Sequence, residues 1–154
     1  MKISKLFQAN SKLSWRDMQH IVVHTANPDP LLHEDGWAVN GIGRKFSHKF
    51  GYGLMDASEM VNVALGWPGV GPQRECLSAM MRPNLSLSKN SNDPVKVAVH
   101  MDGCKDQKAK AISSLEHVVC RVTIKHSPRG SLHLVLVSPM GTRSSILLPR
   151  PKVK

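Results

Sequence analysis

A pair of histidines suggests the first chemistry to consider, which is metal binding. His20 and His24 are four residues apart, and this spacing puts both rings on one face of a helix, where they could share a metal ion. A zinc peptidase of the His-Glu-x-x-His type needs a glutamate between them, but residues 21 to 23 are Ile-Val-Val, and we identify no third ligand. We therefore expect two surface or capping histidines and no metal site in this chain.

Nucleophilic catalysis is the second chemistry that the residue types suggest. Asp17 and His20 lie three residues apart and could belong to a catalytic triad. A nucleophile is missing, because no Gly-x-Ser-x-Gly segment occurs and Ser138 is followed by a proline in a predicted turn. Glu116 and His117 would point to opposite faces of a strand and could not easily act together. We expect no catalytic residue, and we interpret Asp17 as an acid that stabilises a helix N-terminus.

Three cysteines, Cys76, Cys104 and Cys120, lack the Cys-x-x-Cys spacing of a zinc or redox site. Cys120 falls in an alternating apolar pattern and is predicted to be a small buried hydrophobe. Cys76 and Cys104 lie in polar, loop-like surroundings and are the better disulfide candidates if the chain meets an oxidising compartment. Asn84-Leu85-Ser86 is a candidate N-glycosylation triplet, which requires secretion.

The chain has 154 residues with 21 basic and 11 acidic side chains, a formal net charge of +10. The basic residues are spread thinly, and no aromatic pair is placed for base stacking, so we favour a solvated basic surface over a nucleic-acid interface. Apolar runs are far shorter than the roughly 20 residues of a membrane-spanning helix. The first residues have no apolar region after their positive flank, so we expect no export signal in this chain.

Two helices are predicted in the first half of the chain. Ser14 is a typical N-cap with an acid three residues later, and apolar side chains recur at helical spacing, which predicts a helix over about 14–25. A second helix is predicted over about 55–66. Residues 27–53 contain many glycines and prolines, so we expect a loop with at most short strand pieces near 46–50.

The pattern changes after Trp67, where two prolines and two glycines occur within residues 68–72. Downstream the apolar period is two, which predicts antiparallel strands between residues 73 and 148, with runs over 95–99, 118–124 and 132–136. Residues 127–130 resemble a hairpin turn between two of these runs. Only residues 84–93 resemble a low-complexity linker.

Several segments resemble kexin/furin-type proprotein convertases, which are subtilisin-like serine endopeptidases followed by a P (homo B) domain. The segment LSWRDMQHIVV, residues 13–23, resembles the helix that follows the nucleophile segment in this family. Further matching segments are, in order, Gly36-Trp37, Asn40–Gly43, Phe50–Ala57, Pro72–Cys76, Ser114–Val118, Arg129–Leu132 and Ser138–Ser144. The resemblance runs from about residue 9 to residue 151.

The resemblance implies a composite fold. Residues 1–66 would be the C-terminal helix and loop remnant of a subtilisin-like α/β catalytic domain, residues 67–72 a linker, and residues 73–154 an incomplete P domain, a truncated jelly-roll-like antiparallel β-sandwich. It also implies a P-domain disulfide between Cys76 and Cys104 and a free thiol at Cys120. Arg129-Gly130-Ser131 stands where many relatives have Arg-Gly-Asp, so no role is carried over to that tripeptide.

The implied activity of the full enzyme is calcium-dependent cleavage of proproteins at paired basic residues in the secretory pathway, in the Golgi or outside the cell. The family's catalytic Asp, His and Ser, its oxyanion-hole Asn and its calcium ligands lie upstream of the point where this chain begins. We therefore expect the chain alone to be inactive and to hold no cofactor. The alternative is a non-enzymatic stabilising or interaction module whose P-domain strands bind another protein.

Overall fold

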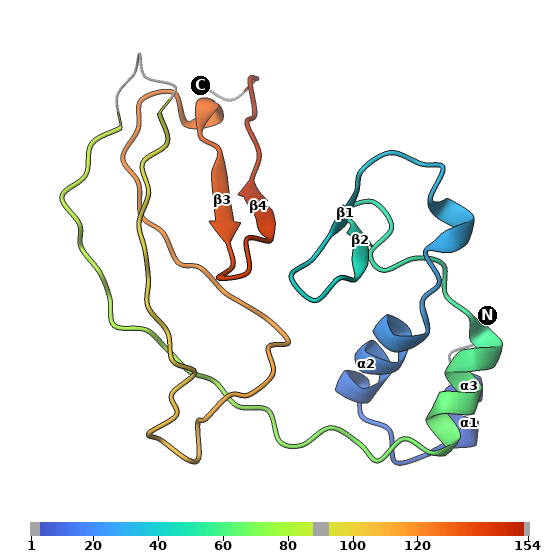
Figure 1. The fold of residues 1–154 in the computed structure, drawn as a ribbon. Coiled ribbons are helices and arrows are strands. Elements are labelled where there is room, and N and C mark those ends of the chain that lie inside the picture. The colour runs from blue at the N-terminus through green and yellow to red at the C-terminus, as the bar shows by residue number, and fades with distance from the viewer. Residues whose placement is uncertain (1–3, 88–92, 153–154) are drawn as a thin grey trace. The chain divides into compact units, whose positions relative to one another are not determined.

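The computed structural model describes residues 4–87 and 93–152. Within them the chain forms three α-helices, two 3-10 helices and two small antiparallel sheets (Figure 1). In chain order the elements are α1 (Ser4–Ala9), α2 (Trp15–Thr25), η1 (Asp29–Leu31), β1 (Trp37–Val39), β2 (Lys45–Ser47), α3 (Ala57–Leu65), η2 (Arg129–Ser131), β3 (Leu134–Val137) and β4 (Arg143–Leu147). None of the helices in the described residues is long and apolar enough to cross a membrane.

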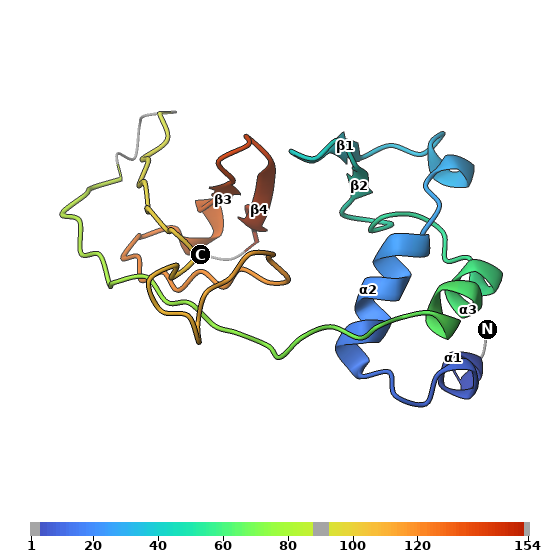
Figure 2. The ribbon, with the colours of Figure 1, turned by 60° about the horizontal axis from the view of Figure 1, so that its bottom comes forward.

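The chain divides into two compact units. The first contains the residues up to 71 together with 132–149, and the second contains residues 72–131 together with the residues from 150 on. All three α-helices belong to the first unit, where α1 and α2 both pack against α3 (Figure 1, Figure 2).

Helix α2 confirms the helix predicted over 14–25. Its N-cap is Ser14, whose hydroxyl accepts a hydrogen bond from the Asp17 amide at 3.2 Å, while the Asp17 carboxylate accepts one from the Ser14 amide at 2.7 Å. This reciprocal pair is a capping box, which satisfies two amides that have no partner within the helix. The helix ends at Thr25, and an Asn-Pro dipeptide follows at residues 27 and 28.

Helix α3 confirms the helix predicted over 55–66. The Asp56 side chain is its N-cap and accepts hydrogen bonds from the amides of Ser58 and Glu59 at 2.9 and 3.0 Å. The helix ends before Gly66, the residue type most common at such ends. The N-terminal cap of this helix therefore needs only residues that lie next to one another in the sequence.

The core of the first unit lies where the three helices meet. Five side chains are buried there, namely Leu6, Leu13, Ile21, Met60 and Ala64. Burying a large aliphatic side chain contributes about 1.5 to 3 kcal/mol, so this small cluster is the main hydrophobic contribution to the unit. Helix α1, which the sequence reasoning did not predict, supplies Leu6 to this core.

The segment between α2 and α3 is mostly loop, as predicted, but one of its two short strands lies outside the region near residues 46–50 where strand pieces were expected. Strand β2 lies close to the predicted strand piece, and β1 pairs with it antiparallel, with Trp37 opposite Ser47. The two ends of the segment are joined by paired backbone hydrogen bonds between Asn27 and Leu54, at 2.9 and 2.8 Å. Gly53 has φ +127°, and a Cβ there would run into the backbone of Asn27, so only glycine allows this approach.

Of the three strand runs predicted downstream of residue 73, the structure confirms one. The run predicted over 132–136 contributes β3, which pairs antiparallel with β4, with Val137 opposite Arg143. The strands predicted over 95–99 and 118–124 and the hairpin turn at 127–130 are wrong, since no paired strand occurs in the described residues between 72 and 131. An alternating pattern indicates which side chains would share one face of a strand. A strand also needs a neighbouring strand with which its backbone can form hydrogen bonds.

The expected burial of three side chains depended on those strands. Cys120 is exposed and has a free thiol, so its prediction as a buried hydrophobe is wrong. Val97 is 48% exposed and Val122 51% exposed, although both were expected on strand faces. Without a paired strand, the alternating side chains have no sheet face on which to pack.

Candidate functional site

The buried carboxylate of Asp17 is the most highly connected polar group that the structure describes. Its side chain is 3% exposed. One oxygen, Oδ2, accepts hydrogen bonds from the amide and the hydroxyl of Ser14, at 2.7 and 2.5 Å. The other, Oδ1, accepts from the Trp67 indole Nε1 at 2.8 Å and from the Val70 amide at 2.7 Å. We call these four residues the Asp17 node, and it joins the start of α2 to the chain that follows α3.

The protonation state of Asp17 follows from this geometry. Burial raises the pKa of Asp17, because desolvation penalises the charged form, but the hydrogen bonds from Ser14, Trp67 and Val70 favour the carboxylate and prevail. The net effect lowers the pKa from its ordinary value of 3.8 to about 2. A general base that works near neutral pH needs a pKa near 7, so this carboxylate anchors hydrogen bonds and is unsuited to that role.

Two more side chains hold the same segment, residues 67–71, which we call the exit segment. Arg16, beside Asp17 on α2, donates from Nη1 to the Gly71 carbonyl at 2.8 Å. Asn10 donates from Nδ2 to the Trp67 carbonyl at 3.5 Å and to the Ala64 carbonyl, near the end of α3, at 3.0 Å. The path of the chain after α3 is therefore fixed against α1 and α2 by side-chain hydrogen bonds as well as by core packing.

The two histidines that the sequence singled out lie beside the same tryptophan. The ring centroids of His20 and His24 are 6.5 and 5.7 Å from that of Trp67. Across the described ranges, no three His, Cys, Asp or Glu side chains are grouped as a metal site would need. What these histidines share in the structure is an aromatic neighbour in the exit segment.

The other residues considered for catalysis lie apart from the Asp17 node in the sequence and have other surroundings. Glu116 and His117 are exposed and lie outside any strand. Ser138 lies in the turn between β3 and β4, as predicted, where its hydroxyl accepts a hydrogen bond from the Thr142 amide at 3.1 Å. The Asp17 interpretation as a helix-capping acid is confirmed, but its bonds to Trp67 and Val70 were not foreseen.

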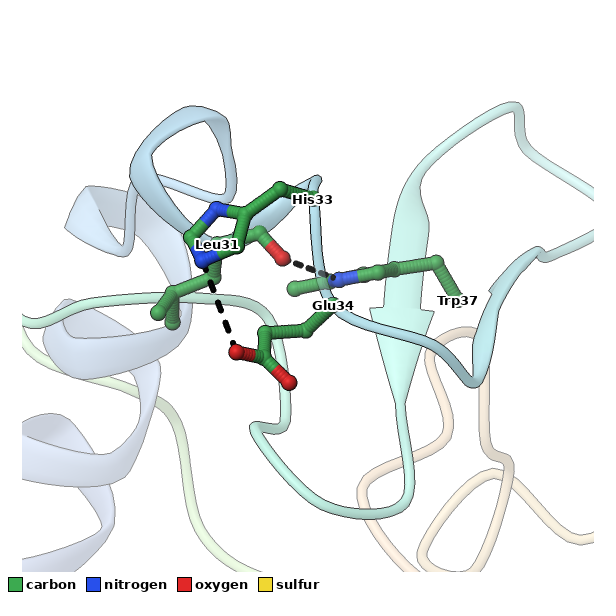
Figure 3. Close-up of polar contacts among 4 residues, drawn as sticks. All are labelled: Leu31, His33, Glu34 and Trp37. Carbon is green, nitrogen blue, oxygen red and sulfur yellow. Dashed lines mark hydrogen bonds and ion pairs between the residues drawn. The ribbon is translucent and has the colours of Figure 1, made fainter.

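A second cluster that the sequence reasoning missed surrounds Trp37 (Figure 3). Its indole Nε1 donates to the Leu31 carbonyl at 2.8 Å, and its ring stacks on Phe50 with centroids 6.1 Å apart. His33 Nε2 lies 3.4 Å from Glu34 Oε1, with side chains 72% and 45% exposed. Such an exposed ion pair contributes little to stability. The link between η1 and β1 in this cluster is therefore the hydrogen bond from Trp37 to Leu31.

Arg44 closes the other end of α2. Its Nη2 donates to the Val23 carbonyl at 2.6 Å, and its guanidinium lies 4.7 Å from the centre of the Tyr52 ring. A cation near a helix C-terminus complements the helix dipole, and a guanidinium over an aromatic face gains further attraction. No local motif marks Arg44, because its partners come from separate parts of the chain.

The second unit contains a disulfide between Cys76 and Cys104, whose Cα atoms are 5.8 Å apart. Beside it, the Asp102 side chain accepts a hydrogen bond from the Cys104 amide at 2.8 Å. Arg74, two residues before the first cysteine, donates from Nη1 to the Ala111 carbonyl at 2.9 Å. The covalent link thus lies among local contacts that gather residues 74–76 and 102–111.

The sequence of the chain is similar to that of one family of known proteins. The proprotein convertase P-domain matches residues 115–154. The chain is 44% identical over 145 residues to "Furin-like protease 2" of Drosophila melanogaster, covering 94% of the chain and 9% of that protein. It is 43% identical over 149 residues to furin of Homo sapiens, covering 97% of the chain and 18% of furin.

A third relative agrees with these two. "Proprotein convertase subtilisin/kexin type 4" of Rattus norvegicus is 40% identical over 149 residues, covering 97% of the chain and 21% of that protein. The chain therefore spans at most about a fifth of the length of these relatives. Its few helices and two small antiparallel sheets are compatible with a truncated P domain. Over this span, the chain belongs to the furin-type proprotein convertase family.

Proposed function

We propose that this chain is the joining segment of a furin-type proprotein convertase and that it supports the enzyme rather than cutting peptide bonds itself. In this proposal residues 1–66 end the catalytic domain, residues 67–72 connect, and residues 73–154 begin the P domain. The similarity to convertases over 97% of the chain supports it, as does the P-domain match over residues 115–154. The single structural observation behind it is the Asp17 node.

The proposed support works through the exit segment. The resemblance identifies α2 with the helix that follows the nucleophile segment of the catalytic domain. Asp17 on that helix accepts hydrogen bonds from Trp67 and Val70, which lie where the chain would pass into the P domain. A displacement of the exit segment would therefore break bonds to a buried carboxylate, which is costly. This couples the entry of the P domain to the catalytic-domain helix.

The activity of the complete enzyme is proposed from the family. It would be a serine endopeptidase that processes proproteins at paired basic residues in the secretory pathway and depends on calcium. In the part of the chain that the structure describes, no three His, Cys, Asp or Glu side chains come together as candidate metal ligands. Calcium dependence is therefore proposed for the complete enzyme only, and no step is assigned to calcium here.

The test compares the complete convertase with its Asp17→Asn variant. An amide at this position replaces an acceptor by a donor that faces existing N–H or O–H groups, so we expect less folded enzyme and a lower melting temperature. Cleavage of a peptide with a Lys-Arg site is measured per folded molecule and should change little. The matched control is Asp35→Asn, since Asp35 is exposed in a loop.

The 154-residue chain is assayed alone on the same peptide. No turnover is expected with calcium present. Turnover that calcium enhances and a serine-directed inhibitor abolishes would contradict the supporting role. Equal melting temperatures for Asp17→Asn and the parent convertase would contradict the part assigned to the Asp17 node.

A second candidate function is a non-enzymatic interaction module. It is favoured by exposed apolar side chains in the second unit, such as Val99 at 52% and Val118 at 59%. In this case the chain would bind a convertase in trans. Sedimentation of the chain mixed with a complete convertase distinguishes the two functions, because a joining segment that acts in cis predicts no such complex.

A further inference from the structure

The segment that follows Cys76 is open to solvent. Met80 is 81% exposed and Leu85 is 53% exposed. Asn84 and Ser86 are exposed as well and lie outside any helix or strand. The Leu85 amide donates to the Pro83 carbonyl at 3.1 Å, which closes a three-residue turn centred on Asn84. Asn84 is therefore at the middle of an accessible turn.

The residue types at this turn form an acceptor for one specific modification. Asn84-Leu85-Ser86 is the only Asn-x-Ser/Thr triplet in the sequence. Neither its middle residue, Leu85, nor the residue that follows the triplet, Leu87, is proline. The enzyme that attaches N-linked oligosaccharides requires this triplet on an accessible surface loop. Both requirements, the triplet and the accessible backbone, are met at the same place.

A second observation concerns the compartment. Asn84 lies within the covalent loop that the Cys76–Cys104 disulfide closes. Disulfides persist in the oxidising lumen of the secretory pathway and are rare in the reducing cytosol. N-linked oligosaccharides are attached in the same lumen. The disulfide and the triplet therefore point independently to one environment for this loop.

We propose that Asn84 is an N-glycosylation site of this chain. In the transfer, the amide nitrogen Nδ2 of Asn84 forms a bond to C1 of an oligosaccharide, and the amide loses a proton. The bond between C1 and the lipid pyrophosphate that carries the oligosaccharide breaks, and the pyrophosphate leaves with the electron pair. The inference goes beyond the proposed function, because it requires no protease activity.

The experiment expresses the chain behind a cleavable secretory leader in mammalian cells. Lysate and medium are treated with peptide N-glycosidase, and alkylation without reduction identifies the molecules that carry the disulfide. We expect one enzyme-sensitive mobility shift in the wild type. Asn84→Gln and Ser86→Ala should abolish it, whereas Ser86→Thr, which keeps the triplet, should retain it.

The matched control is Asn62→Gln, since Asn62 is exposed on α3 but is not part of a triplet; this variant should keep the shift. The proposal is overturned if the disulfide-bonded wild type shows no shift. It is also overturned if the shift persists in Asn84→Gln. Because the readout is the attached sugar, its failure is separate from any failure of the supporting role.

Discussion

A single carboxylate carries four hydrogen bonds at the start of helix α2. Two of them come from Ser14 and are local, so the serine and the acid three residues later predict them. The other two come from Trp67 and Val70, which are 50 and 53 residues away in the chain. No sequence pattern marks such partners, because an indole and a backbone amide can each donate to many groups. The helix cap could be predicted, and the node could not.

The lowered pKa of Asp17 gives a prediction for the pH dependence of stability. Because the folded pKa, about 2, lies below the ordinary 3.8, this carboxylate stabilises the fold above pH 4 and loses that effect as the pH falls towards 2. The expected loss is about 2 kcal/mol, since one pKa unit corresponds to about 1.4 kcal/mol. Urea unfolding from pH 5 to pH 2, followed by tryptophan fluorescence, measures it.

The comparison for this measurement is Asp17→Asn, which has no group to titrate at this position. Its unfolding free energy should be lower than that of the parent at pH 5 and should fall less on acidification. The control Asp35→Asn should follow the parent curve. Parallel curves for Asp17→Asn and the parent would show that the carboxylate does not contribute in this way.

At the scale of elements, the helices and the strands differ in what the sequence can specify. Helices α2 and α3 were predicted from their apolar spacing, together with the Ser14 cap in α2, because these signals are local. The Asp56 cap of α3 is equally local but was not part of the prediction. The strands predicted over 95–99 and 118–124 were wrong because a strand depends on partners elsewhere in the chain. Helix α1 was missed, since six residues from Ser4 to Ala9 carry too short a pattern to recognise.

Helix packing in the first unit gives a prediction at this scale. Ile21 on α2 is fully buried, whereas Leu65 on α3 is 65% exposed. We expect Ile21→Ala to lower the unfolding free energy by about 2 to 4 kcal/mol, because it removes buried methyl groups and leaves a cavity. Leu65→Ala should change it by less than about 0.5 kcal/mol, as is usual for surface substitutions.

The measurement is urea unfolding followed by the helical circular dichroism signal at neutral pH. Both variants replace a branched aliphatic residue by alanine in a helix, so differences in helix propensity are small. Equal effects of the two substitutions would mean that the core formed by α1, α2 and α3 does not hold the first unit together.

At the scale of the whole molecule, the two units rely on different interactions. Among the residues that the structure describes, the buried hydrophobic ones all belong to the first unit and lie between Leu6 and Ala64. The second unit instead has a disulfide and turns, such as the hydrogen bond from the Ile112 amide to the Gly103 carbonyl at 2.9 Å. A covalent link is a common substitute where a chain buries little apolar surface.

This difference predicts that reduction will act on one unit only. In the chain-entropy treatment, closing a loop with a sequence separation of 28 contributes about 3.6 kcal/mol. We expect a Cys76→Ser and Cys104→Ser double variant to lose hydrogen-exchange protection at the amides of Lys110 and Ile112. Amides within α2 and α3 should keep their protection, because the described residues that form their core belong to the first unit.

The control for this experiment is Cys120→Ser, which removes the free, exposed thiol and should leave both sets of amides unchanged. If the double variant also lost protection in α2, the helical core would depend on the disulfide, and the two units could not be energetically separate. Protection lost only within residues 103–112 would instead mean that the link stabilises its own turns. The exit segment would then be held by the Asp17 node without help from the disulfide, as a joining segment requires.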